Sequence, residues 1–155
     1  MSKITLSEIL SAIDQGGRDI WDLLDDEQRK EVKFFLLNRY VSSVKNPKRD
    51  IQEHYVLATN EYFNKHFYAL GKHPKLLWQL LCMCGYETKQ AYFHEWIGHK
   101  KKAGDSKKTK FLEKVYPDLK SSDIETLAKI NSVKELKQLA NDLSWSDEEI
   151  KNYFS

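Results

Sequence analysis

The chain has 155 residues, of which 41% are hydrophobic and 31% are charged, and its net charge at pH 7 is +2. This composition is ordinary for a globular protein and excludes an intrinsically disordered chain. No apolar run approaches the ~18 residues of a membrane span, and no secretory signal is evident, so we expect a soluble cytoplasmic protein with no membrane partner. The sequence lacks the P-loop and other glycine-rich motifs, which excludes phosphate binding by a glycine loop.

Capping signals and helical periodicity predict two helices near the N-terminus. Thr5 and Glu8 form a capping box that predicts a helix over residues 6–14. The acidic turn that begins at Asp25 predicts a longer helix over residues 25–44, because its apolar residues recur at helical spacing.

Three further helices are expected before residue 98. The spacing of apolar residues predicts one over residues 49–70, and Pro74 favours the first turn of another over residues 75–83. The third is expected over residues 87–97. The helix over 75–83 is apolar on nearly every side, so it lies either in the core or at an interface with a partner.

A basic segment follows, and its charge is the most informative feature of the sequence. Residues 100–116 hold seven lysines against Asp105 and Glu113, a local charge of +5. We expect residues 99–110 to form a basic loop or linker. Because lysine acts as a point charge, such a segment suits sequence-independent contact with phosphates or with an acidic partner, and a merely solvated loop remains the alternative. The lysines that would make this contact are Lys100, Lys101, Lys102, Lys107, Lys108 and Lys110.

The C-terminal part again predicts short helices, over residues 111–116 and 121–130. Capping boxes that begin at Ser132 and at Ser146 predict two more. We therefore expect an all-α protein with three parts: a helical domain over residues 1–98, the basic segment, and a small helical subdomain over residues 111–155.

Two groups of side chains between residues 78 and 99 suggest further roles. Cys82 and Cys84 could be combined with His94 and His99 in a metal site, which would suit a small metal-dependent enzyme. Cysteines two residues apart on a helix point in different directions, so we prefer two buried structural thiols and expect no metal and no cofactor. The aromatic residues form either core or partner anchors; these are Trp78, Tyr86, Tyr92, Phe93 and Trp96.

The order of several short motifs resembles the small, non-ATPase subunit of the sliding-clamp loader of T4-like bacteriophages. The similarity spans about residues 6–130 and departs from that family in the basic segment, where the family has arginine and a Trp-x-Lys-like element and this chain has only lysine. The matching elements are residues 9–15, residues 34–42, the Asn60-Glu61…Asn64 helix, residues 76–81, residues 94–97 before the basic segment, and residues 119–123.

This resemblance implies a non-catalytic subunit that joins four copies of an AAA+ ATPase subunit in a heteropentamer. Its N-terminal helices would belong to a collar-type bundle, and its C-terminal part would lie near the sliding clamp and primer–template DNA in the infected bacterial host. Phe35 and Arg39 would join the aromatic residues at the partner interface. A stand-alone DNA-binding or regulatory helical protein that uses the lysine-rich segment is the alternative.

Overall fold

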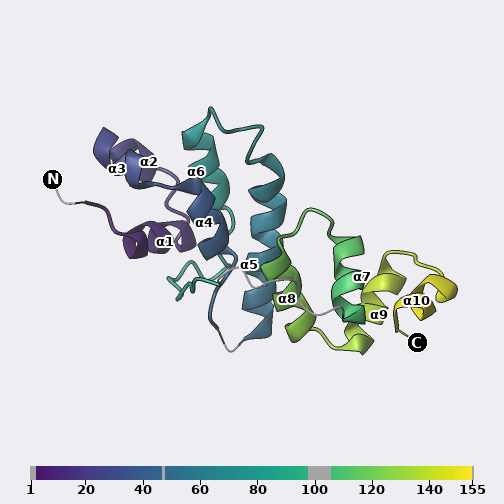
Figure 1. Ribbon diagram of the computed structural model, residues 1–155. Coiled ribbons are helices and arrows are strands. Elements are labelled where there is room, and N and C mark those ends of the chain that lie inside the picture. Colours follow the sequence, from purple (N-terminus) through teal and green to yellow (C-terminus); the bar gives the residue numbers. More distant parts are fainter. Residues whose placement is uncertain (1–2, 47, 98–105, 155) are drawn as a thin grey trace. The chain divides into compact units, whose positions relative to one another are not determined.

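The computed structural model describes residues 3–46, 48–97 and 106–154. Over these residues the regular structure is helical, with one isolated β-bridge in place of a sheet. The predicted all-α class is therefore confirmed. The chain divides into two compact units, residues 1–97 (unit 1) and residues 98–155 (unit 2), whose helices are labelled in Figure 1.

Unit 1 begins with α1 (Leu6–Asp14), and the capping box predicted for it is present. The Thr5 backbone N–H donates to the Glu8 carboxylate at 2.7 Å, and the Glu8 N–H donates back to the Thr5 hydroxyl at 3.3 Å. The end of α1 lies against Gly85. A Cβ at that glycine would come within 2.6 Å of the Asp14 carbonyl oxygen, so this close approach of two backbones requires glycine.

Three short helices follow: α2 (Ile20–Leu23), α3 (Asp26–Glu31) and α4 (Phe34–Val41). The single helix predicted over residues 25–44 was wrong, because the chain leaves the helical conformation at Val32, where ψ is 89°. Val32 is buried in the core of the unit. In a continuous helix the Val32 side chain would lie on a face that points away from the core. The chain leaves the helical conformation here because this side chain is buried instead.

The second half of unit 1 is built on α5 (Arg49–Tyr62), the 3₁₀ turn η1 (Asn64–His66) and α6 (Pro74–Cys82). The helix predicted over residues 49–70 therefore ends early. Fully buried Tyr55, Phe63 and Trp78 form the centre of the core between these elements.

No helix forms over the described residues 87–97, where one was predicted. Residues 87–88 form a turn, and further along His94 forms an antiparallel bridge with Val44. We call residues 91–97 the extended segment. The prediction failed because the segment is held by hydrogen bonds to residues far away in the sequence, which helical periodicity does not report.

Unit 2 consists of α7 (Lys107–Val115), α8 (Ser121–Ile130), α9 (Val133–Asp142) and α10 (Asp147–Phe154). Residues 107–110 were predicted within a basic loop and are instead the first turn of α7, capped by the Ser106 hydroxyl, which accepts from the Thr109 N–H at 3.2 Å. The remaining residues of that predicted loop that precede Ser106 lie outside the described residues, and His99 is among them. Buried apolar side chains form the core of the unit; they are Phe111, Leu112, Ile124, Leu127, Leu136, Ala140 and Ile150.

Candidate partner-binding surface

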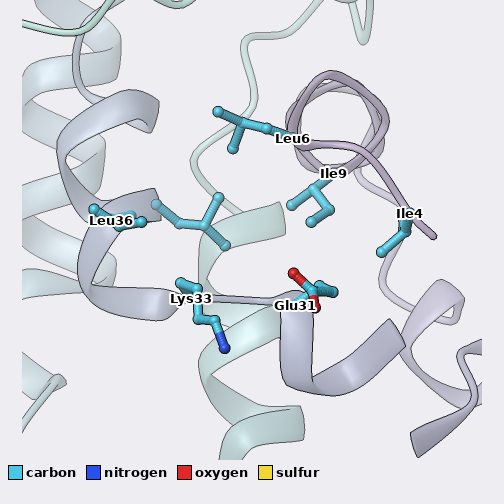
Figure 2. A pocket seen from close by; sticks show the side chains of 7 residues that line it. Ile4, Leu6, Ile9, Glu31, Lys33 and Leu36 are labelled. Atoms are coloured by element: carbon cyan, nitrogen blue, oxygen red, sulfur yellow. The ribbon is translucent and has the colours of Figure 1, made fainter. Parts of the chain in front are cut away.

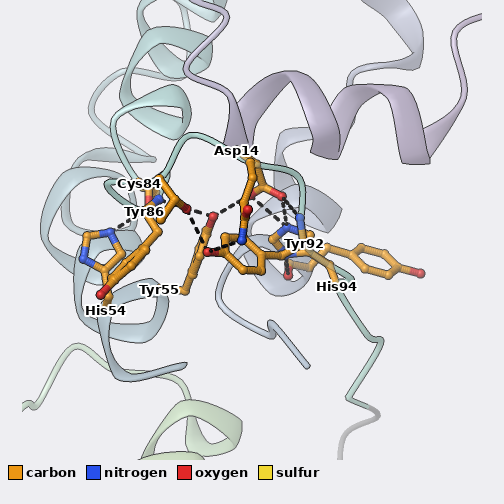
Figure 3. Close-up of polar contacts among 10 residues, drawn as sticks. Asp14, His54, Tyr55, Cys84, Tyr86, Tyr92 and His94 are labelled. Atoms are coloured by element: carbon orange, nitrogen blue, oxygen red, sulfur yellow. Dashed lines mark hydrogen bonds and ion pairs between the residues drawn. The ribbon is translucent and has the colours of Figure 1, made fainter. Parts of the chain in front are cut away.

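A buried polar network holds the surface of unit 1 in place, and Asp14 is its centre (Figure 3). The Asp14 side chain is fully buried at the last residue of α1. Its carboxylate accepts a hydrogen bond from the Tyr55 hydroxyl at 2.7 Å and another from the Tyr92 backbone N–H at 2.7 Å. Because buried carboxylates are stable only when paired, these contacts fix α1, α5 and the extended segment together.

His94 completes the network from the extended segment. Its Nδ1 lies 2.8 Å from the Tyr40 carbonyl oxygen, and its Nε2 lies 3.0 Å from both carboxylate oxygens of Asp14. A carbonyl oxygen only accepts, so Nδ1 carries a proton. The contact between Nε2 and the carboxylate then requires one further proton between them, and the pair is a buried group without net charge.

Tyr55 donates to Asp14 and remains a donor at all ordinary pH values. Burial, and then the charge of Asp14, raise the pKa of the Tyr55 phenol far above its usual value. The phenol oxygen also accepts from the Tyr86 backbone N–H at 3.3 Å. We did not predict this network from the sequence, although one signal pointed to it. Asp14 follows the buried Ile13 at the C-terminal end of a helix, where the helix dipole disfavours a negatively charged carboxylate.

Backbone hydrogen bonds also hold the extended segment against the residues that follow α4. The Lys45 N–H donates to the Phe93 carbonyl at 2.8 Å, and the Glu95 N–H donates to the Ser43 carbonyl at 2.9 Å. Neighbouring side chains in an extended segment point to opposite sides. With His94 directed into the core, Phe93 is directed outward, and 67% of it is exposed.

Two open grooves lie on either side of Leu6, and their linings form the Leu6 surface. The first has a volume of about 210 Å³ and is mainly apolar, with Glu31 and Lys33 at its edge (Figure 2). The second has a volume of about 430 Å³ and is bounded by α1 and the extended segment. The residues of the Leu6 surface used below are Ile4, Leu6, Ile9, Leu36, Tyr40 and Phe93.

A cation–aromatic stack stands beside the second groove. The Arg39 guanidinium lies 4.7 Å from the centre of the Trp96 ring and donates to the Ile97 carbonyl at 3.1 Å. The Trp96 and Tyr40 rings are 5.3 Å apart. Arg39 and Trp96, both expected at a partner interface, therefore lie together, and Trp96 is exposed.

The other residues expected at the interface are in different environments. Trp78 does not lie at the surface of unit 1: it is fully buried in the core, and its indole N–H donates to the Gly17 carbonyl at 3.0 Å. Tyr86 and Tyr92 are half-buried against the polar network. Phe35 on α4 is 63% exposed, outside the linings of the two grooves.

The lysines of the basic segment fall into three groups. Lys100, Lys101 and Lys102 lie outside the described residues. Lys107 and Lys110 are exposed on α7. Lys108 is different, because its ammonium donates to the carbonyls of Ala128 at 3.1 Å and Asn131 at 2.8 Å and thereby caps the C-terminal end of α8. Lys108 thus has a structural role in unit 2, and its cation is already engaged by the chain.

Cys82 and Cys84 are both buried free thiols. Burial raises the pKa of each thiol from 9.0 to about 12. The Cys84 thiol donates to the Leu80 carbonyl at 3.4 Å, and both ring nitrogens of His94 are engaged in the network described above. Among the described residues there is no group of three or more His, Cys, Asp or Glu side chains that could hold a metal ion.

Within the described part of the chain, no helix is long and apolar enough to cross a membrane. Comparisons of the chain with protein-family models, with characterised proteins and with solved structures gave no match.

Proposed function

We propose that this chain is a non-catalytic subunit of a phage DNA polymerase sliding-clamp loader. In this role it completes an assembly with four copies of an AAA+ ATPase and helps to place the sliding clamp on primer–template DNA. The proposal rests on the sequence resemblance and on one structural observation, the Leu6 surface. A monomer that leaves two neighbouring apolar grooves and an exposed Phe93 uncovered has the features of a subunit in a larger complex.

The hydrogen bonds that hold part of this surface in place support a docking role. Side chains that bind a partner contribute most when they are held in place before binding. The polar network does this for the extended segment that carries Phe93, through the buried His94 and the Tyr92 backbone N–H. The proposed partner would cover the Leu6 surface with apolar side chains of its own, while Glu31 and Lys33 offer polar contacts at the edge.

The test is co-expression with the AAA+ ATPase encoded by the same phage, followed by mass measurement of the purified complex. We expect a complex with one copy of this chain and four of the ATPase. Leu6→Gln and Phe93→Gln are each expected to weaken the complex at least tenfold without unfolding the chain. Leu23→Gln is the matched control, because Leu23 is also exposed and lines neither groove. A chain that never co-purifies with the ATPase would contradict the proposal.

The alternative is a stand-alone DNA-binding or regulatory protein, and the lysine-rich segment favours it. It predicts duplex binding by the isolated chain with a salt dependence that decreases when Lys100, Lys101 and Lys102 become alanine. Lys108 must be left intact in this experiment, because its loss would disturb α8. Changing three exposed lysines of unit 2 to alanine, Lys134 and Lys137 on α9 and Lys151 on α10, serves as the charge-matched control. Absence of duplex binding at low salt would reject the alternative.

A further inference from the structure

The connection between α5 and α6 carries a concentration of positive charge. The sequence from Tyr62 to Tyr86 contains no acidic residue. Most of the connection between the two helices is exposed, including the basic side chains, and it forms one end of the α5–α6 hairpin (Figure 1). The basic residues of the connection are Lys65, His66, Lys72 and His73, and Lys75 follows in the first turn of α6. Together with Tyr68 we call these residues the α5–α6 tip.

Among the described residues Tyr68 is the most exposed aromatic side chain, at 87%. Its position is nevertheless well defined. The Phe67 ring packs on the fully buried Phe63 with 5.4 Å between the ring centres, and the Tyr68 ring meets Phe67 edge-on at 5.2 Å. Successive backbone hydrogen bonds, such as Leu70 N–H to the His66 carbonyl at 2.9 Å, hold the turns between them. The packing of Phe67 on the core therefore holds the exposed Tyr68 ring in a defined position.

The charges around this ring are only partly neutralised. Lys65 pairs with Glu61 at 2.7 Å, and Lys75 pairs with Asp22 of α2 at 2.8 Å. Lys72 forms no ion pair within the part of the chain that the structure describes. The exposed Tyr68 ring and the exposed Lys72 ammonium, four positions later in the same connection, are the combination that binds single-stranded nucleic acid, because a base stacks on the ring and the phosphate backbone passes the cation.

We propose that the α5–α6 tip binds single-stranded nucleic acid, with a base stacked on Tyr68 and the backbone phosphates beside Lys72. The chemistry favours this partner over an anionic membrane. A membrane-binding segment needs an apolar face that can enter the lipid, whereas Phe63 is fully buried and Phe67 is packed against it. This site shares no residue with the Leu6 surface or with the lysine-rich segment, so it does not rest on the proposed function.

The experiment measures the binding of a fluorescently labelled oligothymidine to the full chain at low salt, by anisotropy. Base stacking on one aromatic ring is worth at least about fivefold in affinity. We therefore expect Tyr68→Ala to weaken binding by about fivefold or more, and Tyr68→Phe, which keeps the ring, to stay within about twofold of the parent. Lys72→Ala is expected to reduce the dependence of affinity on salt, whereas the control Lys137→Ala leaves it unchanged.

The same titrations in a chain with Lys100, Lys101 and Lys102 changed to alanine separate the two basic regions. If the tip binds, the effect of Tyr68→Ala persists in this background. Equal affinity of the parent and Tyr68→Ala would overturn the proposal, as would equal affinity of Tyr68→Ala and Tyr68→Phe. Binding to anionic phospholipid vesicles in preference to the oligonucleotide would also overturn it. None of these results depends on whether the chain forms a complex with an ATPase.

Discussion

Asp14 joins three parts of unit 1 that are far apart in the sequence, and it does so without any exposure to solvent. Each of its contacts satisfies a donor that would otherwise be buried without a partner. The Tyr55 hydroxyl, the Tyr92 N–H and the His94 imidazole all depend on this one carboxylate. A residue of this kind contributes to stability and, through the extended segment, to the shape of the Leu6 surface.

We expect Asp14→Ala to lower the free energy of unfolding of unit 1 by about 3–5 kcal/mol, because it leaves the buried imidazole and two further donors without an acceptor. Urea denaturation followed by circular dichroism measures the change. Asp19→Ala removes an exposed carboxylate a short distance along the chain and should change the free energy by less than about 0.5 kcal/mol. An equally small effect of Asp14→Ala would show that the network is not important for stability.

The two cysteines give the protein a defined response to alkaline pH. Burial raises the pKa of both thiols from 9.0 to about 12, so between these values the unfolded chain loses protons that the folded chain keeps. The stabilisation is fully present below pH 9 and is lost as the pH rises towards 12. Each thiol contributes a decrease of up to about 1.4 kcal/mol per pH unit in this window.

This decrease is measurable as the change in urea midpoint with pH. The slope should become smaller in the Cys82→Ala and Cys84→Ala variants when each is compared with its own stability below pH 9. In the native parent, both thiols should also react with a thiol reagent far more slowly than in urea, since the thiolate is the reactive form. Rapid reaction of the native protein would contradict the burial on which the expectation rests.

At the level of helices, local signals predicted where several elements begin. The capping boxes at Thr5, at Ser132 and at Ser146 are all present, because a capping box involves only residues three apart. Such a signal is complete within a few residues of sequence. Helix starts were therefore the most predictable part of the fold.

The ends and interruptions of helices were harder to predict, because they depend on distant partners. The break at Val32 follows from burial in the core, and the extended conformation around His94 follows from a carboxylate that lies 80 positions earlier in the sequence. The exposed Phe93 and Trp96 were identified from composition, but their grouping with Leu6 and Arg39 follows from that extended segment. Trp78 has the same residue type as Trp96, and nothing local distinguishes the buried one from the exposed one.

The role of Lys108 in unit 2 was also hard to predict from the sequence, because its partners at the end of α8 lie 20 and 23 positions away. We expect Lys108→Met, which keeps the apolar stem, to lower the free energy of unfolding of unit 2 by about 1–2 kcal/mol, since two charge-assisted hydrogen bonds to the end of α8 are lost. Lys137→Met on α9 is the control and should be neutral within about 0.5 kcal/mol. If both variants unfolded alike, the ammonium of Lys108 would have no capping role.

For the whole molecule, the division into two compact units leads us to predict two separate unfolding reactions. The core of unit 1 is centred on Trp78 and Tyr55, and that of unit 2 includes Phe111, whose ring packs against Trp145 with 5.2 Å between the ring centres. Each unit thus encloses its own apolar core and contains at least one tryptophan. Both are small, so the stability of each should respond strongly to a single change in its core.

We expect Asp14→Ala to shift the unfolding of unit 1 alone and Leu136→Ala, which removes a buried side chain of unit 2, to shift the unfolding of unit 2 alone by about 2–5 kcal/mol. Fluorine NMR of the chain labelled with fluorotryptophan separates the two reactions, because Trp78 reports on one core and Trp145 on the other. In a urea titration, each variant should move the midpoint of its own reporter and leave the other in place. Joint movement of both midpoints in either variant would instead mean that the two units unfold as one cooperative body.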